Sequence, residues 1–129
     1  MDKVEHFEIP ADDRKRAMSF YTKLFKWEPN PVPGVEDYTR LLTIRTGEIV
    51  APQQRPFEVN GAIVKRSSAV DTPVVSVSVA DIDDTLRRIE QEGGKILAGK
   101  TEFGNRCYTA YFRDTEGNTI GLWQFRTKA

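Results

Sequence analysis

The chain repeats one pattern of secondary structure, and this repeat restricts its possible folds more than any other feature. Each half has an alternating strand, then an amphipathic helix, then about three further strands. Asp13 and Asp81 are suited to cap the two predicted helices and lie 68 positions apart. We therefore predict an α+β fold in which two βαβββ modules form a curved mixed sheet around a pocket. The modules take up about residues 1–66 and 74–125 of a single domain, 1–129.

The first half opens with an alternating segment, Val4 to Ile9, which predicts a strand with His6 and Glu8 on one face. A helix is predicted over residues 14–25 because four apolar side chains recur at helical spacing: Ala17, Phe20, Tyr21 and Leu24. A proline-rich turn is predicted over 29–34. Further strands are predicted over 38–46 and 60–66, with a loop over 47–58 between them.

The second half follows the same order. A strand over 74–79 precedes a helix over 82–92, whose apolar side chains are Ile82, Leu86 and Ile89. Gly93 and Gly94 end the helix. Strands over 95–97, 106–113 and 118–125 follow, the last two joined by a turn at 114–117. Aligning the return strands of the two halves, 61–64 with 119–122, places Ile63 opposite Gly121.

Composition excludes several classes of function. Nineteen basic and nineteen acidic residues balance, so no net positive charge attracts nucleic acid or a membrane surface. Cys107 is the single cysteine, which excludes an internal disulfide and a multi-cysteine zinc site, and His6 is the single histidine. The N-terminus has no apolar signal core, and no apolar run approaches the ~20 residues of a membrane helix. We expect a cytoplasmic protein without nucleic-acid or membrane partners.

Four short motifs in order carry a family resemblance. They are HFEIPADD at 6–13, LFKW at 24–27, NGAIVKR at 60–66 and YFRDTEGN at 111–118, with Thr115 where the family usually has proline. Together they resemble the glyoxalase/bleomycin resistance/dioxygenase superfamily, also called vicinal oxygen chelate proteins, in the branch related to lactoylglutathione lyase. The resemblance implies paired βαβββ modules, a U-shaped pocket and a homodimer.

The resemblance also implies a divalent metal held by four side chains, one from each of four strands. The corresponding positions here are His6, Val74, Gly121 and a residue near Ile63. Only His6 offers a donor atom, whereas a divalent cation requires several nitrogen or oxygen ligands. We therefore expect no metal cofactor. A relocated ion held by His6 and Glu8, with Cys107 as a third ligand, is the alternative.

The pocket is expected to bind a small organic ligand. Strand parity places seven candidate ligand-binding residues on its inner face: His6, Glu8, Ser76, Ser78, Tyr111, Gly121 and Trp123. An apolar lining with a few polar groups is typical of small-molecule sites. Gly121 is expected to leave space where relatives place a metal ligand.

Two other classes of function stay open. One is a lyase or isomerase on a small carbonyl substrate, with His6 and Glu8 as a catalytic acid–base pair about 6.5–7 Å apart along the strand, with or without a relocated metal. The other is a non-catalytic interaction module. Structural roles are the alternative for each residue: His6 as a hydrogen-bonded interior histidine, Glu8 as the partner of an arginine, and Trp123 as a core anchor.

Overall fold

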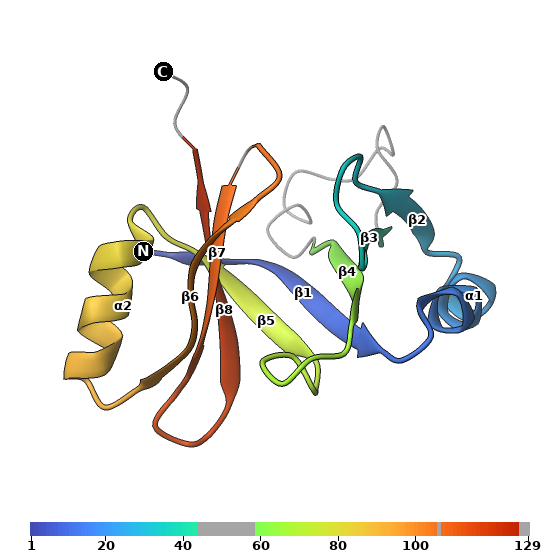
Figure 1. The fold of residues 1–129 in the computed structure, drawn as a ribbon. Coiled ribbons are helices and arrows are strands. Elements are labelled where there is room, and N and C mark those ends of the chain that lie inside the picture. The colour runs from blue at the N-terminus through green and yellow to red at the C-terminus, as the bar shows by residue number, and fades with distance from the viewer. Residues whose placement is uncertain (44–58, 106, 127–129) are drawn as a thin grey trace.

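The computed structural model describes residues 1–43, 59–105 and 107–126, which contain two helices and eight strands (Figure 1). The elements of the first half are β1 (Lys3–Ala11), α1 (Arg14–Phe25), β2 (Glu28–Pro31), β3 (Tyr38–Leu42) and β4 (Gly61–Lys65). Those of the second half are β5 (Val74–Ser78), α2 (Ile82–Gln91), β6 (Lys95–Phe103), β7 (Cys107–Arg113) and β8 (Thr119–Phe125).

All eight strands belong to one sheet, in the order β2-β3-β4-β1-β5-β8-β7-β6. Within each half the first strand pairs in parallel with the last, β1 with β4 and β5 with β8. The halves join through antiparallel pairing of β1 with β5, where His6 faces Ser76 and Glu8 faces Val74. The predicted α+β architecture with one mixed sheet is confirmed.

The helices cover the outer side of the sheet at opposite ends of the molecule, as Figure 1 shows. Ile82 and Leu86 of α2 pack with Val79, Ala110 and Leu122. At the other end, Ala17 and Tyr21 of α1 pack against a second outer cluster: Ala11, Leu41 and Ile63. A third cluster lies on the inner face and contains Tyr38, Ala62, Val64, Val70, Val74, Cys107 and Trp123. Much of the inner face is therefore filled by side chains.

Both predicted helix starts are confirmed by capping hydrogen bonds. The Asp13 carboxylate accepts from the backbone N–H of Arg16 at 3.0 Å, and Asp81 accepts from that of Asp84 at 3.1 Å. These bonds satisfy N–H groups that the first turn of a helix otherwise leaves without acceptors.

Three predictions about local structure need correction. Phe20 and Leu24 are 57% and 56% exposed, because α1 contacts the sheet through Ala17, Met18 and Tyr21 instead. The proline-rich segment predicted as a turn begins with β2, an edge strand where proline is tolerated. β6 continues to Phe103, well past the predicted end at residue 97. The predicted loop over 47–58 lies outside the described residues.

The predicted alignment of Ile63 with Gly121 is off by one position. Ala62 pairs with Glu8 in β1, just as Gly121 pairs with Ser76 in β5, so Ala62 is the structural counterpart of Gly121. Ile63 instead packs in the outer cluster beneath α1. A one-residue change of register reverses the face of a strand, which places Ala62 on the inner side.

Neither described helix combines the length and the hydrophobicity needed to cross a membrane.

Candidate functional site

Two rows of side chains cross the inner face of the sheet. His6, Ser76, Gly121 and Tyr111 form one row through successive pairings of β1, β5, β8 and β7. The other row contains Arg40, Ala62, Glu8 and Val74. Five of the predicted site residues thus lie in two adjacent rows. The other two, Ser78 and Trp123, pair with each other further along β5 and β8, and Ser78 also pairs with Lys3 of β1.

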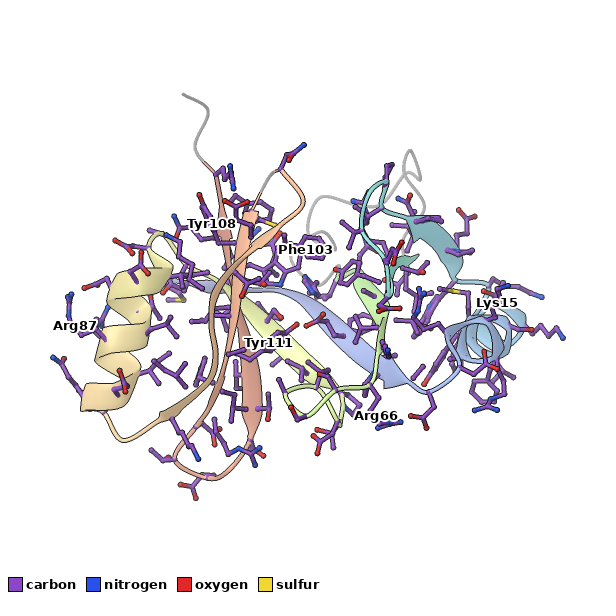
Figure 2. The ribbon with its side chains drawn as sticks, in the orientation of Figure 1. Lys15, Arg66, Arg87, Phe103, Tyr108 and Tyr111 are labelled. Atoms are coloured by element: carbon purple, nitrogen blue, oxygen red, sulfur yellow. The ribbon has the colours of Figure 1, made fainter. Side chains whose placement is uncertain are left out.

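A hydrogen bond from Tyr111 to Glu8 joins the two halves across this face. The Tyr111 hydroxyl donates to Oε1 of Glu8 at 2.5 Å, although β5 and β8 separate their strands in the sheet. In Figure 2 the labelled Tyr111 side chain lies between the two halves, on the side of the sheet away from α2. Glu8 is only 2% exposed. The structure therefore couples Glu8 to Tyr111 through a hydrogen bond.

Gly121 lies next to Ser76 and Tyr111 on the inner face. A Cβ atom at position 121 would lie 2.4 Å from Oγ of Ser76 and 3.4 Å from Cε1 of Tyr111. The space that we expected above Gly121 is thus occupied by Ser76 and Tyr111, which the sequence could not show. The overlap at this position is therefore with Ser76, whereas the Tyr111 ring would be in ordinary contact with an added Cβ.

Burial dominates the electrostatics of Glu8. Loss of solvent raises its pKa above the ordinary carboxyl value, and the hydrogen bond from Tyr111 acts in the opposite direction. Burial raises the pKa of Tyr111 as well, and the neighbouring Glu8 charge raises it further, so Tyr111 stays a protonated donor. The pKa of Tyr38 is raised for the same two reasons. In the described residues Glu8 forms no ion pair, contrary to the arginine pairing considered above.

His6 is a neutral interior residue. Its ring meets Trp123 edge to face, with centroids 4.3 Å apart, and burial lowers its pKa to about 4. Nε2 of His6 and Oγ of Ser76 are buried without a hydrogen-bond partner in the part of the chain that the structure describes. His6 is therefore not protonated at neutral pH, which makes it a poor general acid there.

The residues present do not fit the four-ligand metal that the resemblance implied. With the register corrected, the four positions are His6, Ala62, Val74 and Gly121, of which only His6 has a donor atom in its side chain. Over residues 1–43, 59–105 and 107–126, no three His, Cys, Asp or Glu side chains gather closely enough to hold an ion. Burial raises the pKa of Cys107 to about 11, so it is a thiol at neutral pH, whereas metals bind the thiolate.

Three hollows adjoin on the inner face, and Tyr38 and Trp123 line all of them. The hollow beside Glu8, of about 270 Å³, is also lined by Phe103 and Tyr111, and we call it the Glu8 hollow. Hollows of about 540 Å³ and 450 Å³ lie beside His6 and Cys107. A larger one, about 820 Å³, lies along α1 among mostly polar side chains, and neither His6, Glu8 nor Tyr111 lines it.

Sequence reasoning missed Tyr38 and Phe103 as site residues. Tyr38 starts β3 with its side chain on the inner face, and its ring centroid lies 4.6 Å from that of Phe103. Phe103 packs in turn on Trp123 at 5.2 Å. The sequence predicted the strand that begins at Tyr38 but not which face of the sheet this side chain takes, whereas Phe103 lay beyond the predicted end of β6.

Comparisons with known proteins agree with this architecture. A model of the Glyoxalase/Bleomycin resistance protein/Dioxygenase superfamily matches residues 3–122. A glyoxylase-like domain-containing protein from Didymella fabae is 27% identical over 122 residues, covering 93% of this chain and 91% of that protein.

Solved structures share the fold at low sequence identity. A member of the same superfamily from Vibrio splendidus 12B01 has a TM-score of 0.62 at 14% identity, covering 98% of this chain and 100% of the other. A variant of Streptomyces coelicolor methylmalonyl-CoA epimerase, in complex with 2-nitronate-propionyl-CoA, has a TM-score of 0.66 at 16% identity, with coverages of 95% and 93%.

Replacing Gly121 by alanine tests the packing over β8. We expect Gly121→Ala to lower the free energy of unfolding by about 1–3 kcal/mol, because the new Cβ overlaps Oγ of Ser76. In a Ser76→Ala background the loss should be smaller, since the overlapping oxygen is gone. Gly99→Ala is the matched control, because a Cβ there meets nothing within 4 Å. Urea denaturation measures the free energy of unfolding of Gly121→Ala, Ser76→Ala, the double variant and Gly99→Ala. Equal losses of stability in Gly121→Ala and Gly99→Ala would contradict this packing.

The neutral state of His6 makes stability depend on pH. Its folded pKa lies below the unfolded value of 6.5, so its contribution is complete above that value and is lost as the pH falls toward 4. Between about pH 7 and about pH 4.5, the wild type should lose about 2–3 kcal/mol more stability than His6→Phe, which keeps a ring but does not titrate.

Chemical denaturation of both proteins at the two pH values measures this difference. Glu8, whose folded pKa is raised, changes stability in the opposite direction, but it does so in both proteins and cancels. Identical pH profiles for wild type and His6→Phe would show that His6 is not buried as described.

Proposed function

This chain belongs to the glyoxalase/bleomycin resistance protein/dioxygenase superfamily, and from its inner face we propose that it binds a small organic molecule in the Glu8 hollow without the four-ligand metal. One observation carries the proposal. A buried carboxyl group, held by a phenol from the opposite half, lies beside a hollow lined largely by apolar side chains. A few fixed polar groups in an apolar lining are the usual features of small-molecule sites.

The dimensions of the hollow suit a fragment-sized ligand. Its volume of about 270 Å³ is close to the lower end of ligand pockets, which begin at about 300 Å³. The exposed residues Glu36 and Lys65 line it as well, so it reaches solvent between them. The rings of Tyr38, Phe103 and Trp123 offer flat apolar surfaces on which a planar group can pack.

The donor set supports binding without a divalent ion. Alanine, valine and glycine occupy three of the four implied ligand positions, and a single imidazole binds a cation weakly. A ligand would therefore be held through hydrogen bonds and apolar contacts from this chain.

Proton transfer at Glu8 is a second candidate function, favoured by the raised pKa of this carboxyl. A carboxyl group whose pKa is shifted toward neutrality suits general acid–base work on a carbonyl compound. Solved methylmalonyl-CoA epimerases share this fold, a likeness that supports the architecture and leaves the reaction open. Exchange of solvent deuterium onto a bound carbonyl compound, lost in Glu8→Gln, would identify this lyase or isomerase chemistry.

Other expectations stay predictions: a homodimer, a cytoplasmic location, one domain of two modules, and membership of the lactoylglutathione lyase branch.

Fluorescence of Trp123 tests the proposed function. The chain has two tryptophans, so Trp27→Phe leaves Trp123 as the single indole, and it lines all three inner hollows. Titration with benzyl alcohol or acetophenone should change its emission saturably, with a Kd on the order of 1 mM, as expected for so few ligand atoms. Dialysis against a chelator should leave this response unchanged.

The complementary variant Trp123→Phe is the control. It retains Trp27, which packs in the outer aromatic cluster with Phe7, Tyr21 and Phe25, and its emission should not respond. A chain in which neither indole responds would contradict the proposal. Binding abolished by the chelator and restored by Zn²⁺ would instead establish a relocated metal.

A further inference from the structure

Resting on the function proposed above, we infer that the Glu8 hollow selects a small organic amine in its protonated, ammonium form. Three features of the hollow favour this ligand class: the acidic side chain of Glu8, the aromatic rings around the hollow and the acceptor atom of Glu8 that the protein leaves free.

Glu8 is a buried acid without a cationic partner. Six ion pairs connect described residues, and Glu8 belongs to none of them. Its hydrogen bond is to the neutral hydroxyl of Tyr111. A buried carboxylate is costly unless a positive charge is close, so an ammonium group entering the hollow would supply the charge that the chain does not provide.

Two exposed residues of opposite charge line the hollow besides Glu8, and they contribute little to the electrostatic potential inside it. Glu36 and Lys65 both line the hollow, are exposed and have opposite charges. Exposed charges are also screened by water and salt far more than buried ones. Among the acidic and basic side chains that line the hollow, Glu8 is the buried one.

Aromatic rings surround the same space. Tyr38 and Phe103 meet edge to face at 4.6 Å, and Phe103 packs on Trp123 at 5.2 Å, so three rings form a continuous wall. The faces of such rings attract cations, and an organic ammonium gains both this attraction and apolar contact with its hydrocarbon part. A carboxylate or phosphate ligand would be repelled by Glu8 and by the ring faces.

Tyr111 leaves one carboxyl oxygen available. Its hydroxyl donates to Oε1 of Glu8, and the described residues offer no donor to Oε2. A carboxylate accepts several hydrogen bonds, and an alkylammonium has three N–H donors. The Glu8–Tyr111 pair is therefore already oriented to receive an amine, since Tyr111 fixes the carboxyl group without neutralising it.

Two probes of nearly equal size, benzylamine and benzyl alcohol, test this inference. Both are titrated at neutral pH into the Trp27→Phe chain, with Trp123 emission as the readout. The amine should bind at least about tenfold more tightly than the alcohol, a preference equivalent to about 1.4 kcal/mol. In Glu8→Gln, which keeps an oxygen acceptor for Tyr111, the amine should lose this advantage while the alcohol still binds.

Glu36→Gln is the matched control, because it removes the other acid that lines the same hollow. It should change amine affinity less than about threefold, since that charge is exposed. Should Glu8→Gln fail to fold, the affinities of benzylamine and benzyl alcohol for the Trp27→Phe chain still decide whether the hollow prefers the ammonium form.

The outcomes separate the two claims. Binding of the alcohol with no preference for the amine would overturn this inference and leave the proposed function standing. An equal loss of amine affinity in Glu36→Gln and Glu8→Gln would also overturn it, because the attraction would then be diffuse. Failure of both probes to bind would contradict the inference and the proposed function together.

Discussion

The hydrogen bond between Tyr111 and Glu8 is the contact on which the inner face of this protein depends. It connects β7 of one half to β1 of the other across two intervening strands. Gly121 lies on β8, one of these two strands, and a Cβ atom there would overlap Oγ of Ser76. The hydrogen bond also holds an acid in a place where solvent and cations do not stabilise its charge, which gives the neighbouring hollow its chemical character.

The internal repeat explains how this arrangement differs from a metal site. The approximate two-fold relation between the halves makes Val74 the counterpart of His6, and Ser76 the counterpart of Glu8. Both halves therefore carry a further donor on the inner face, Glu8 in β1 and Ser76 in β5. Each lies two residues along its strand from an implied ligand position, His6 and Val74 respectively. The family resemblance implied four metal ligands on this framework. In this chain the inner face instead carries the carboxyl group of Glu8, the hydroxyl group of Ser76 and the imidazole of His6.

The sequence predicted the architecture well because its signals were local. The caps at Asp13 and Asp81 and the alternation of 74–79 each depend on neighbouring residues alone. The inner-face placement of Glu8 and Ser76 followed from strand parity in the same way. Helical periodicity predicted α1 but could not tell which of its apolar side chains meet the sheet: Ala17 and Tyr21 do, whereas Phe20 and Leu24 are exposed.

Register and cavity content depend on contacts between distant residues, and the sequence alone could not supply them. A single-residue slip exchanged Ile63 for Ala62 on the inner face. Gly121 indicated a gap, but the filling of that gap by Ser76 and Tyr111 depends on pairings between three strands. Tyr38 and Phe103 likewise lie in the site because of pairings and ring contacts between residues far apart in the sequence.

Both the proposed site and its preference for a cation depend on Glu8 being a buried acid held by a neutral phenol without a compensating cation. An NMR titration of its side-chain carboxyl carbon, assigned by comparison with Glu8→Gln, measures this state directly. We predict an inflection above the ordinary value of 4.5, because burial outweighs the hydrogen bond from Tyr111. An inflection at or below that value would mean that water or a positive charge reaches Glu8, and the account would be contradicted.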